Sequence, residues 1–369
     1  MTKADAAPPL RRGWTTGACA TAATRAAFEA LITGAPPPDP VEIALPSGQR
    51  VAFALALFER GADFCRAGVV KDAGDDPDVT HGALVRALVR RGAAGAGVSF
   101  RAGEGVGRVT RPGLPLPPGE PAINPTPRAM MRQTIGEAAG ALGAAPDAEV
   151  EISIENGAEL ARHTLNARLG IVGGLSVLGT TGIVVPYSCA AWIDSIHRGV
   201  DVARACGLAH VVGSTGSTSE AAARRLHDLP EEALIEMGDF VGGLLKYLRV
   251  NPVPRITLAG GFAKLTKLAQ GRLDLHSGRS SVDFAALAQM AGDAGAGAAL
   301  CARIAGANSA LEALVLAQQG GIDLPAVVAT AAFATAAKAL HGAACEVEIL
   351  VFDRAGALLA RKPFAPVGG

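Results

Sequence analysis

The sequence predicts an α+β fold in its first half and an α/β fold in its second half. The first half places strand-like segments in hairpins beside helices, whereas the second half alternates strand-like and helical segments. Hydrophobic residues make up 49% of the chain and charged residues 18%, which excludes a disordered protein. The 369 residues suffice for two domains. The pattern changes within residues 155–168, so we expect domains of residues 11–160 and 161–369.

The first half begins with an Ala-rich segment over 19–32 that has apolar residues at helical spacing, and Thr15 or Thr16 can cap this predicted helix. Two strand-like segments then flank the turn Pro46-Ser47-Gly48, a pattern typical of a hairpin. The predicted strands cover residues 41–45, 49–57, 65–70, 97–101 and 149–155. The predicted helices cover residues 80–91 and 128–142. A loop rich in Pro and Gly occupies residues 108–127.

The second half contains short apolar strands separated by helices. The predicted strands cover residues 168–172, 183–187, 210–212, 255–259 and 345–352. The predicted helices cover residues 190–205, 219–226, 231–249 and 284–292, with two more after Asn308. This alternation predicts a parallel sheet covered on both faces.

Composition excludes several classes of protein. Lys and Arg total 34, as do Asp and Glu, so the formal net charge is zero and a nucleic-acid partner is not expected. No apolar run approaches the roughly 20 residues of a membrane span, and residues 1–12 lack the apolar core of a signal peptide. The six Cys are scattered singly, which favours reduced thiols in a cytoplasmic protein and no metal site.

Three predicted strands of the second half run into glycine-rich turns. Such turns let a ligand approach the backbone closely, and ligands bind outside the carboxyl ends of parallel strands. We therefore expect one cofactor pocket from the three turns, although neither the six-residue dinucleotide fingerprint nor Gly-Lys-Ser/Thr is present. Ordinary tight turns are the alternative. The candidate residues are Gly173, Gly174, Gly179, Thr180, Thr181, Gly182, Gly213, Ser214, Thr215, Gly216, Gly260 and Gly261.

An acidic turn stands out within residues 68–82, between a predicted strand and a predicted helix. It contains Lys71, Asp72, Asp75, Asp76, Asp78 and His81. A divalent-cation loop is one interpretation, but the Asp spacing does not fit the calcium pattern and no Glu closes it. A catalytic loop is the second, with Lys71 for an anionic group, one Asp as base or orienter and His81 as proton carrier. The third is a solvated turn that caps the next helix.

Arginine is concentrated just beyond this turn. Residues 86–132 hold eight Arg and two Glu, a charge of 8 − 2 = +6. Arg suits carboxylates and phosphates, so this segment predicts a polyanionic small ligand. The first three Arg fit a solvated face of the helix predicted over 80–91, whereas Arg108, Arg111 and Arg128 lie in or beside loops and are the better candidates.

Several long motifs resemble one known family, the CbiD family of cobalt-precorrin-5B C(1)-methyltransferases. They are Arg12-Gly13-Trp14-Thr15-Thr16-Gly17, the whole of residues 68–82, residues 105–114, residues 119–125, residues 168–174 with the following Gly-Thr-Thr-Gly, and Pro186-Tyr187-Ser188. Trp14 stands where the family pattern has Tyr, and Ala18 where it has Thr.

The resemblance implies a methyltransferase that uses S-adenosylmethionine to methylate C-1 of cobalt-precorrin-5B, giving cobalt-precorrin-6A, in cobalamin biosynthesis. It also implies an α+β domain beside a Rossmann-like domain. We expect the α+β domain to bind the corrinoid and the glycine-rich turns to hold S-adenosylmethionine. Our hypothesis gives Lys71, Asp72 and His81 catalytic roles. Substrate contacts are then expected from Thr15, Thr16, Asp75, Asp76, Arg108, Arg111 and Arg128. The corrinoid is the expected partner, and a homo-oligomer is compatible with the sequence.

Two other functions are compatible with the residues themselves. A nucleotide-using α/β enzyme would place its phosphates in the same glycine-rich turns. A non-catalytic corrinoid carrier would bind the macrocycle through the Arg-rich segment and would have no methyl-donor site.

Overall fold

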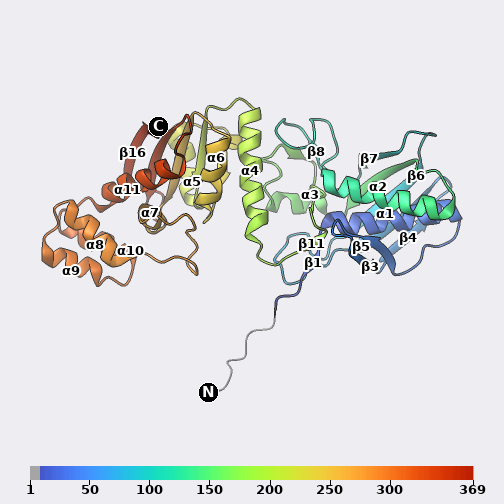
Figure 1. The fold of residues 1–369 in the computed structure, drawn as a ribbon, viewed down its shortest axis with the longest axis horizontal. Helices are drawn as coiled ribbons and strands as arrows, with labels where there is room; N and C mark the ends of the chain where they lie inside the picture. Colours follow the sequence, from blue (N-terminus) through green and yellow to red (C-terminus); the bar gives the residue numbers. More distant parts are fainter. Residues whose placement is uncertain (1–8, 369) are drawn as a thin grey trace, which may run out of the picture. The chain divides into compact units, whose positions relative to one another are not determined.

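The computed structural model describes residues 9–368, which form two compact units (Figure 1). Unit 1 ends at Cys189 and unit 2 begins at Ala190. Both combine helices with sheets of mixed strand orientation, so the protein is of the mixed α/β class.

Unit 1 is built on a five-stranded sheet with the strand order β4-β5-β6-β9-β7. All neighbours in this sheet are antiparallel except β7 and β9. The elements of unit 1 are, in order, β1 (Gly13–Trp14), α1 (Thr16–Thr33), β2 (Val41–Ala44), β3 (Arg50–Phe53), β4 (Leu57–Arg60), β5 (Phe64–Val70), β6 (Leu84–Arg91), β7 (Val98–Ala102), β8 (Arg108–Val109), α2 (Pro125–Leu142), β9 (Ala148–Ile154), α3 (Gly157–Leu160), a 3₁₀ turn (Ala161–His163), β10 (Ile171–Val172) and β11 (Ile183–Val184).

Helix α1 lies against the unit 1 sheet, with α2 packed on it (Figure 1). Thr15 caps the helix by accepting the Ala18 N–H (3.2 Å), and Gly34 ends it in the left-handed conformation. Most residues of α1 are buried, because Ala side chains allow close approach to the sheet on one side and to α2 on the other. The core of unit 1 is formed by α1, α2 and the sheet face beneath them.

Unit 2 is built on a sheet with the strand order β13-β12-β14-β15-β16, in which only β16 is antiparallel to its neighbour. Its elements are α4 (Cys189–Ala205), β12 (His210–Ser214), α5 (Ser217–His227), a 3₁₀ turn (Glu231–Ala233), β13 (Leu234–Glu236), α6 (Val241–Val250), β14 (Arg255–Gly261), α7 (Phe262–Ala269), α8 (Phe284–Asp293), α9 (Ala298–Ala305), α10 (Ala310–Gln319), α11 (Leu324–Ala339), β15 (Glu346–Phe352) and β16 (Leu358–Pro366).

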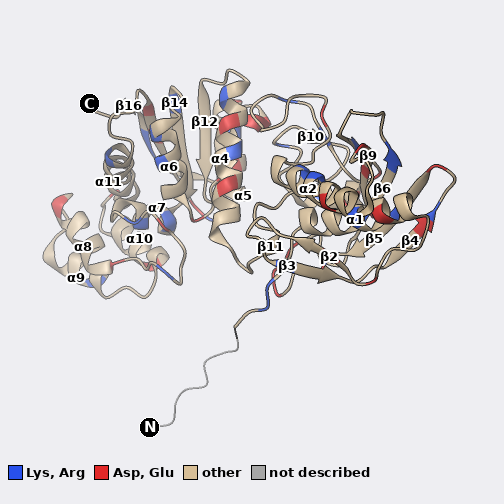
Figure 2. Cartoon of the chain, turned by 45° about the vertical axis from the view of Figure 1, so that its right-hand side comes forward, with Lys and Arg blue, Asp and Glu red and all other residues tan. Residues whose placement is uncertain are grey.

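Alternate residues of the unit 2 strands enter two separate cores. Val211 and Leu258 pack with α4, α6, α7 and α11 on one face, whereas Val212 and Ala259 pack with α5 on the other. The sheet is therefore covered on both faces, as the alternation predicted. Acidic and basic residues alternate along α4 (Figure 2), and Arg198 pairs with both Asp194 and Asp201 at 3.4 Å.

The strand order of unit 2 creates a switch point between β12 and β14. The chain leaves β12 through α5 to reach β13 on one side, then returns through α6 to reach β14 on the other side. Connections from the two neighbouring strands therefore depart in opposite directions. In an open sheet this is where a crevice for a ligand opens at the carboxyl ends of the strands.

The domain boundary lies later in the chain than residues 155–168. Residues 168–172 and 183–187 were expected to be strands of the second-half sheet. Only Ile171–Val172 and Ile183–Val184 are extended, and they pair antiparallel with β8 and β1 of unit 1. Because these pairs fasten residues 171–184 to unit 1, the division falls after Cys189.

Two predicted helices were wrong in part. Residues 84–91 form β6, a central strand in which Val85, Ala87 and Val89 face the core at every second position. Within residues 231–249, β13 precedes α6, and its Leu234 and Ile235 are buried at the sheet edge. In both places tertiary burial overrides the helix propensity of Ala, Leu, Arg and Glu.

Candidate functional site

The acidic turn is the loop that connects β5 to β6. Lys71 N donates to Ala83 O (2.9 Å) and Gly82 N donates to Lys71 O (2.8 Å), so the strand ladder continues beyond Val70 before the loop opens. Residues 72–81 form this loop, which we call the acidic loop. Because strand hydrogen bonds join the residues at its two ends, the positions of these ends are fixed relative to each other.

The segment at residues 11–14 runs along the acidic loop, backbone against backbone. Trp14 N donates to Asp72 O (2.7 Å), and Asp75 N donates to Arg11 O (2.9 Å). A Cβ on Gly74 would lie 2.1 Å from Arg11 O, and a Cβ on Gly13 would lie 2.0 Å from the carbonyl carbon of Ala73. Glycine at both positions is therefore what permits the approach.

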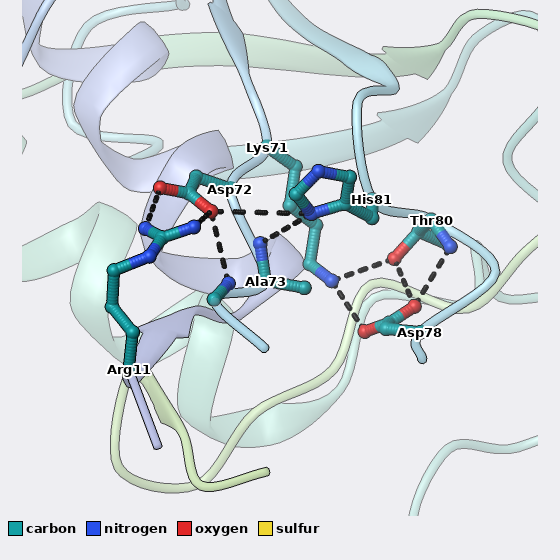
Figure 3. A network of polar contacts seen from close by, with 8 residues as sticks. Arg11, Lys71, Asp72, Ala73, Asp78, Thr80 and His81 are labelled. Carbon is teal, nitrogen blue, oxygen red and sulfur yellow. Dashed lines mark hydrogen bonds and ion pairs between the residues drawn. The ribbon is translucent and has the colours of Figure 1, made fainter. Parts of the chain in front are cut away.

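Three carboxylates of the loop bind other segments. Asp72 pairs with the Arg11 guanidinium through two hydrogen bonds (Figure 3), and this contact lowers the pKa of Asp72 to about 2. Asp75 accepts the Arg11 N–H (2.6 Å), and Asp76 accepts the Tyr187 N–H (2.7 Å). The loop thus joins residues 11–14 and 187 to the end of the β5–β6 hairpin.

Lys71 is buried beneath the loop, and its ammonium is turned inward (Figure 3). Its Nζ pairs with Asp78 and donates to Thr80 Oγ1 (2.7 Å), and 1% of its side chain is exposed. Burial raises the pKa of Asp78, but Lys71 and the hydrogen bonds from Thr80 outweigh this and leave that pKa below its ordinary value. The anionic group that Lys71 holds in this structure is therefore Asp78.

His81 is half exposed at the end of the loop, and its ring orientation is fixed by the backbone. Ala73 N donates to His81 Nδ1 (3.1 Å), and that nitrogen lies 3.9 Å from Asp72 Oδ1 (Figure 3). An Nδ1 that accepts a hydrogen bond carries no proton, so the neutral ring has its proton on Nε2. His81 therefore presents an N–H on the side away from the loop backbone.

Thr15 and Thr16, expected to contact substrate, are buried at the start of α1. The first glycine-rich turn covers them: Gly17 N donates to Leu178 O and Thr15 N to Gly182 O, both at 3.0 Å. Gly179 lies so close that a Cβ there would be 2.3 Å from Thr15 Oγ1. Thr180 and Thr181 remain exposed on this turn. The turn therefore belongs to unit 1 and closes over the N-terminus of α1.

The three candidate Arg differ in exposure. Arg128 is largely buried and donates to Ile123 O (2.8 Å) and Pro121 O (3.0 Å) while pairing with Glu120 (2.8 Å). Arg111 packs over Gly170, where a Cβ would meet its side chain at 2.7 Å. Arg108 is exposed, with Gly119 O at 3.3 Å. Arg128 thus supports the Pro/Gly loop, and Arg108 is the most accessible of the three.

Elsewhere in the Arg-rich segment, carboxylates offset much of the charge. Arg86 pairs with Glu104 and Arg101 with Glu149, at 3.1 and 2.7 Å. Since β6 is a strand, Arg86 and Arg90 stand on the sheet face away from α1, so the predicted helix face does not exist.

The second and third glycine-rich turns lie side by side in unit 2, at the carboxyl ends of β12 and β14. Thr215 N donates to Ala259 O (3.0 Å), which joins the two turns at the switch point. Space is open where a Cβ would stand on Gly216 and on Gly261, the residues that precede α5 and α7. The expectation that three turns meet at one sheet edge was wrong for the first turn, because Gly173, Gly174, Gly179 and Gly182 belong to unit 1 and their flanking strands pair with β8 and β1.

Gly213 and Gly260 have packing roles that their sequence position did not reveal. A Cβ on Gly213 would lie 2.3 Å from Leu244, and one on Gly260 would lie 2.1 Å from Leu265. Ser214 is fully buried and donates to Glu220 (3.2 Å). These residues bring helices close to the sheet, so the free approach to this edge lies at Gly216 and Gly261.

Several side chains beside these two sites were missed by sequence reasoning. In unit 2, Lys264 donates to Thr215 O (2.9 Å) and pairs with Asp239 (3.1 Å), which links the ends of β12 and β13. Trp192, on α4, donates to Glu236 O (3.2 Å). In unit 1 the missed residues are Arg11 and Tyr187. Each acts through partners distant in sequence, and a single sequence carries no signal for such pairing.

None of the helices within residues 9–368 is long and apolar enough to cross a membrane. Within the same part of the chain, no three or more His, Cys, Asp or Glu side chains gather where they could hold a metal ion.

The chain is thus a mixed α/β protein of two units. One unit carries the acidic loop, which is hydrogen-bonded to residues 11–14 and 187, and the other has a sheet edge lined by glycine. Comparison with known families gives two matches. The model described as CbiD covers residues 3–186, and the model described as CbiD, C-terminal domain covers residues 274–363. The chain belongs to the CbiD family, as its motifs predicted.

Curated relatives match over nearly the full length of the chain. A protein of Agrobacterium fabrum is 60% identical over 97% of this chain and 94% of its own. A protein of Methylorubrum extorquens is 60% identical, with 95% and 97% covered. A protein of Halorhodospira halophila is 59% identical, with 99% and 97% covered. All three are named cobalt-precorrin-5B C(1)-methyltransferase. A solved structure of the cobalamin biosynthesis protein cbiD from Archaeoglobus fulgidus is 27% identical, covers 73% of this chain and 83% of its own, and has a TM-score of 0.41.

Proposed function

We propose that this chain methylates C-1 of cobalt-precorrin-5B with S-adenosylmethionine, giving cobalt-precorrin-6A in cobalamin biosynthesis. The observation that carries the proposal is the roughly 60% identity, over almost the whole of both chains, to relatives that bear the name of this activity. The matched length covers 97% of this chain in one relative and 95% in the other, so it extends through both units.

Unit 1 is the proposed corrinoid-binding unit. The substrate has an apolar ring and a rim of acetate and propionate groups, so its site needs exposed apolar surface beside hydrogen-bond donors and positive charge. Unit 1 has exposed apolar side chains at Leu178, Val185 and Tyr187. His81 offers an N–H, and Arg108 is an accessible cation. The acidic loop is hydrogen-bonded to residues 11–14 and to Tyr187, and the carboxylate of Asp72 lies 3.9 Å from the His81 ring.

Unit 2 is the proposed Rossmann-like unit for S-adenosylmethionine. The open space at Gly216 and Gly261 fits a ligand that approaches the backbone at the switch point. Glu236 ends β13, 20 residues after Gly216 (236 − 216 = 20). In dinucleotide-binding sheets, an acidic residue at about this distance accepts the ribose hydroxyls. Lys264 fixes the turn at Thr215 against Asp239, so the edge is preorganised.

The turns at Gly216 and Gly261 would hold S-adenosylmethionine, which would supply an electrophilic methyl group to the electron-rich C-1 of the ring and keep the electron pair of the broken S–CH₃ bond on its sulfur. The residues of this chain then have two tasks, to align the ring and to exclude water. Alignment alone is worth effective molarities of about 10⁵ M or more in favourable systems. Rigid anchoring of the acidic loop by Arg11, Asp75 and Asp76 serves that alignment.

The direct test is incubation with methyl-labelled S-adenosylmethionine and cobalt-precorrin-5B under anaerobic conditions. Mass spectrometry should show one added methyl group, and NMR should place it at C-1. A methyl group at another carbon, or no transfer, refutes the proposal. Binding of corrinoid without any affinity for S-adenosylmethionine would instead identify a carrier, and preference for ATP or NAD would identify a nucleotide-using enzyme.

The location of the cofactor is tested by Gly261→Val. The side chain fills the open space before α7, so the dissociation constant for S-adenosylmethionine should rise at least about tenfold, which corresponds to 1.4 kcal/mol. Gly297→Val is the matched control. Gly297 precedes α9 with a backbone of φ −69° and ψ 157°, against −69° and 152° at Gly261, and it also faces open space. Equal affinities in both variants, measured calorimetrically, would contradict a site at β14.

A further inference from the structure

Tyr187 is the most exposed large apolar side chain of the segment that the acidic loop holds. It follows the buried Pro186, and 67% of its surface is exposed. Its N–H donates to Asp76 Oδ1 (2.7 Å), so its backbone is fixed while its ring stands in solvent. The chain has only two Tyr, and the other, Tyr247, is stacked on His197 and bonded to Asp201.

The backbone of Tyr187 adopts a conformation that a bulky residue avoids. Its φ is +56°, in the left-handed region. The other non-glycine residues with positive φ, among those that the structure describes, are Asn156 and Asp228, whose short polar side chains tolerate this region. Glycine or Asn at 187 would satisfy the turn without strain. The cost of Tyr at this position therefore calls for a role of its ring, because strained residues cluster at ligand-binding sites.

The surroundings indicate what that ring contacts. Two other apolar side chains of this part of the chain are about half exposed. Val185 lies two residues before Tyr187, and Leu178 lies in the first glycine-rich turn. Asp76, which holds Tyr187, belongs to the loop that carries His81. An exposed aromatic ring on a fixed backbone, with exposed apolar side chains on the same segment and an N–H donor on the loop that binds it, suits a large flat ligand with polar edges.

We propose that Tyr187 is a positioning residue for the corrinoid, with its ring against the apolar face of the macrocycle. This inference rests on the proposed function of unit 1. The strained backbone aims the side chain outward, and the hydrogen bond to Asp76 keeps it there. The contact is made by the ring, so the hydroxyl contributes little.

The test compares Tyr187→Phe, Tyr187→Gly and wild type in three measurements: thermal unfolding, titration with cobalt-precorrin-5B followed by absorbance, and titration with S-adenosylmethionine. Tyr187→Phe should keep the corrinoid affinity within about twofold. Tyr187→Gly should weaken it about tenfold or more. The same variant should unfold at a higher temperature, because glycine relieves the strain, and should bind S-adenosylmethionine as wild type does.

Asn156→Gly is the matched control, since it relieves a left-handed backbone (φ +54°) elsewhere in unit 1. It should leave the corrinoid affinity unchanged. Wild-type corrinoid affinity in Tyr187→Gly overturns the inference, and so does an equal loss in Tyr187→Phe and Tyr187→Gly. If wild type itself binds no corrinoid, the proposed function of unit 1 fails, which is a distinct result.

Discussion

Replacement of Asp78 by Asn tests the physical basis of the acidic loop. In the native structure Lys71 is 1% exposed, and its charge is balanced by Asp78, whose side chain is 25% exposed. In Asp78→Asn the amide oxygen can still accept from Thr80 N, but the amide nitrogen then faces the Lys71 ammonium, so two donors meet. The variant leaves a buried cation without its counter-ion.

The magnitude follows from that burial. Breaking a buried ion pair by removing one partner costs about 3–5 kcal/mol. Because Asp78 is partly solvated, we take the lower end, about 3 kcal/mol. A domain of this size loses about 2–4 °C in melting temperature per kcal/mol, so the unfolding of unit 1 should shift by about 6–12 °C.

Differential scanning calorimetry measures this shift, and two comparisons sharpen it. Lys71→Met removes the buried charge and leaves only the partly solvated carboxylate, so it should cost less than Asp78→Asn. The wild-type free energy of unfolding should also fall as pH drops below about 4, because the pKa of Asp78 is lower in the folded state than its ordinary 3.8. A loss below about 0.5 kcal/mol in Asp78→Asn would refute the inward-facing Lys71.

Two further predictions concern single side chains. Arg128→Ala should lower the free energy of unfolding by about 1–3 kcal/mol, since it leaves two loop carbonyls without their donor. Arg132→Ala on the same helix removes only a contact with the Phe100 ring, which Arg128 also makes, so it should cost less, about 0.5–1 kcal/mol. Chemical denaturation of both variants checks this pair, and equal losses would contradict it. Burial, with His227 beside it, lowers the pKa of His210 to about 4, so native stability should decline as pH falls from about 6.5 toward 4. His210→Gln should flatten that slope in a pH series of thermal melts, and an unchanged slope would count against it.

The elements whose patterns are local were predictable. The Ala-rich helix α1, the hairpin at Pro46-Ser47-Gly48 and the alternating strand β9 all carry their signals within a few residues. Strand β6 was misassigned because Arg, Leu and Ala favour helices, although its core-facing positions recur at period two. That strand exists because β5 and β9 pair with both of its edges and α1 covers one of its faces. A single sequence does not state such partners.

The candidate site shows the same division. Clustered Asp, Gly and His marked the acidic loop, and paired glycine turns marked β12 and β14. Sequence did not indicate that Asp72 contacts Arg11 or that Asp76 contacts Tyr187, because the partners are 61 and 111 positions apart. Nor did it distinguish Gly213, which serves packing, from Gly261, which faces open space. Those differences depend on three-dimensional neighbours.

The pairing of β1 with β11 also determines when the N-terminal strand can form its pair during synthesis on the ribosome. Gly13 lies opposite Val184, so the first strand is synthesised 171 residues before its partner (184 − 13 = 171). At roughly 5–20 residues per second, about 10–30 seconds separate the two. Residues 13–14 therefore remain without their strand partner until nearly all of unit 1 has been translated, and the β1–β11 pair is among the last contacts of that unit to form in a nascent chain.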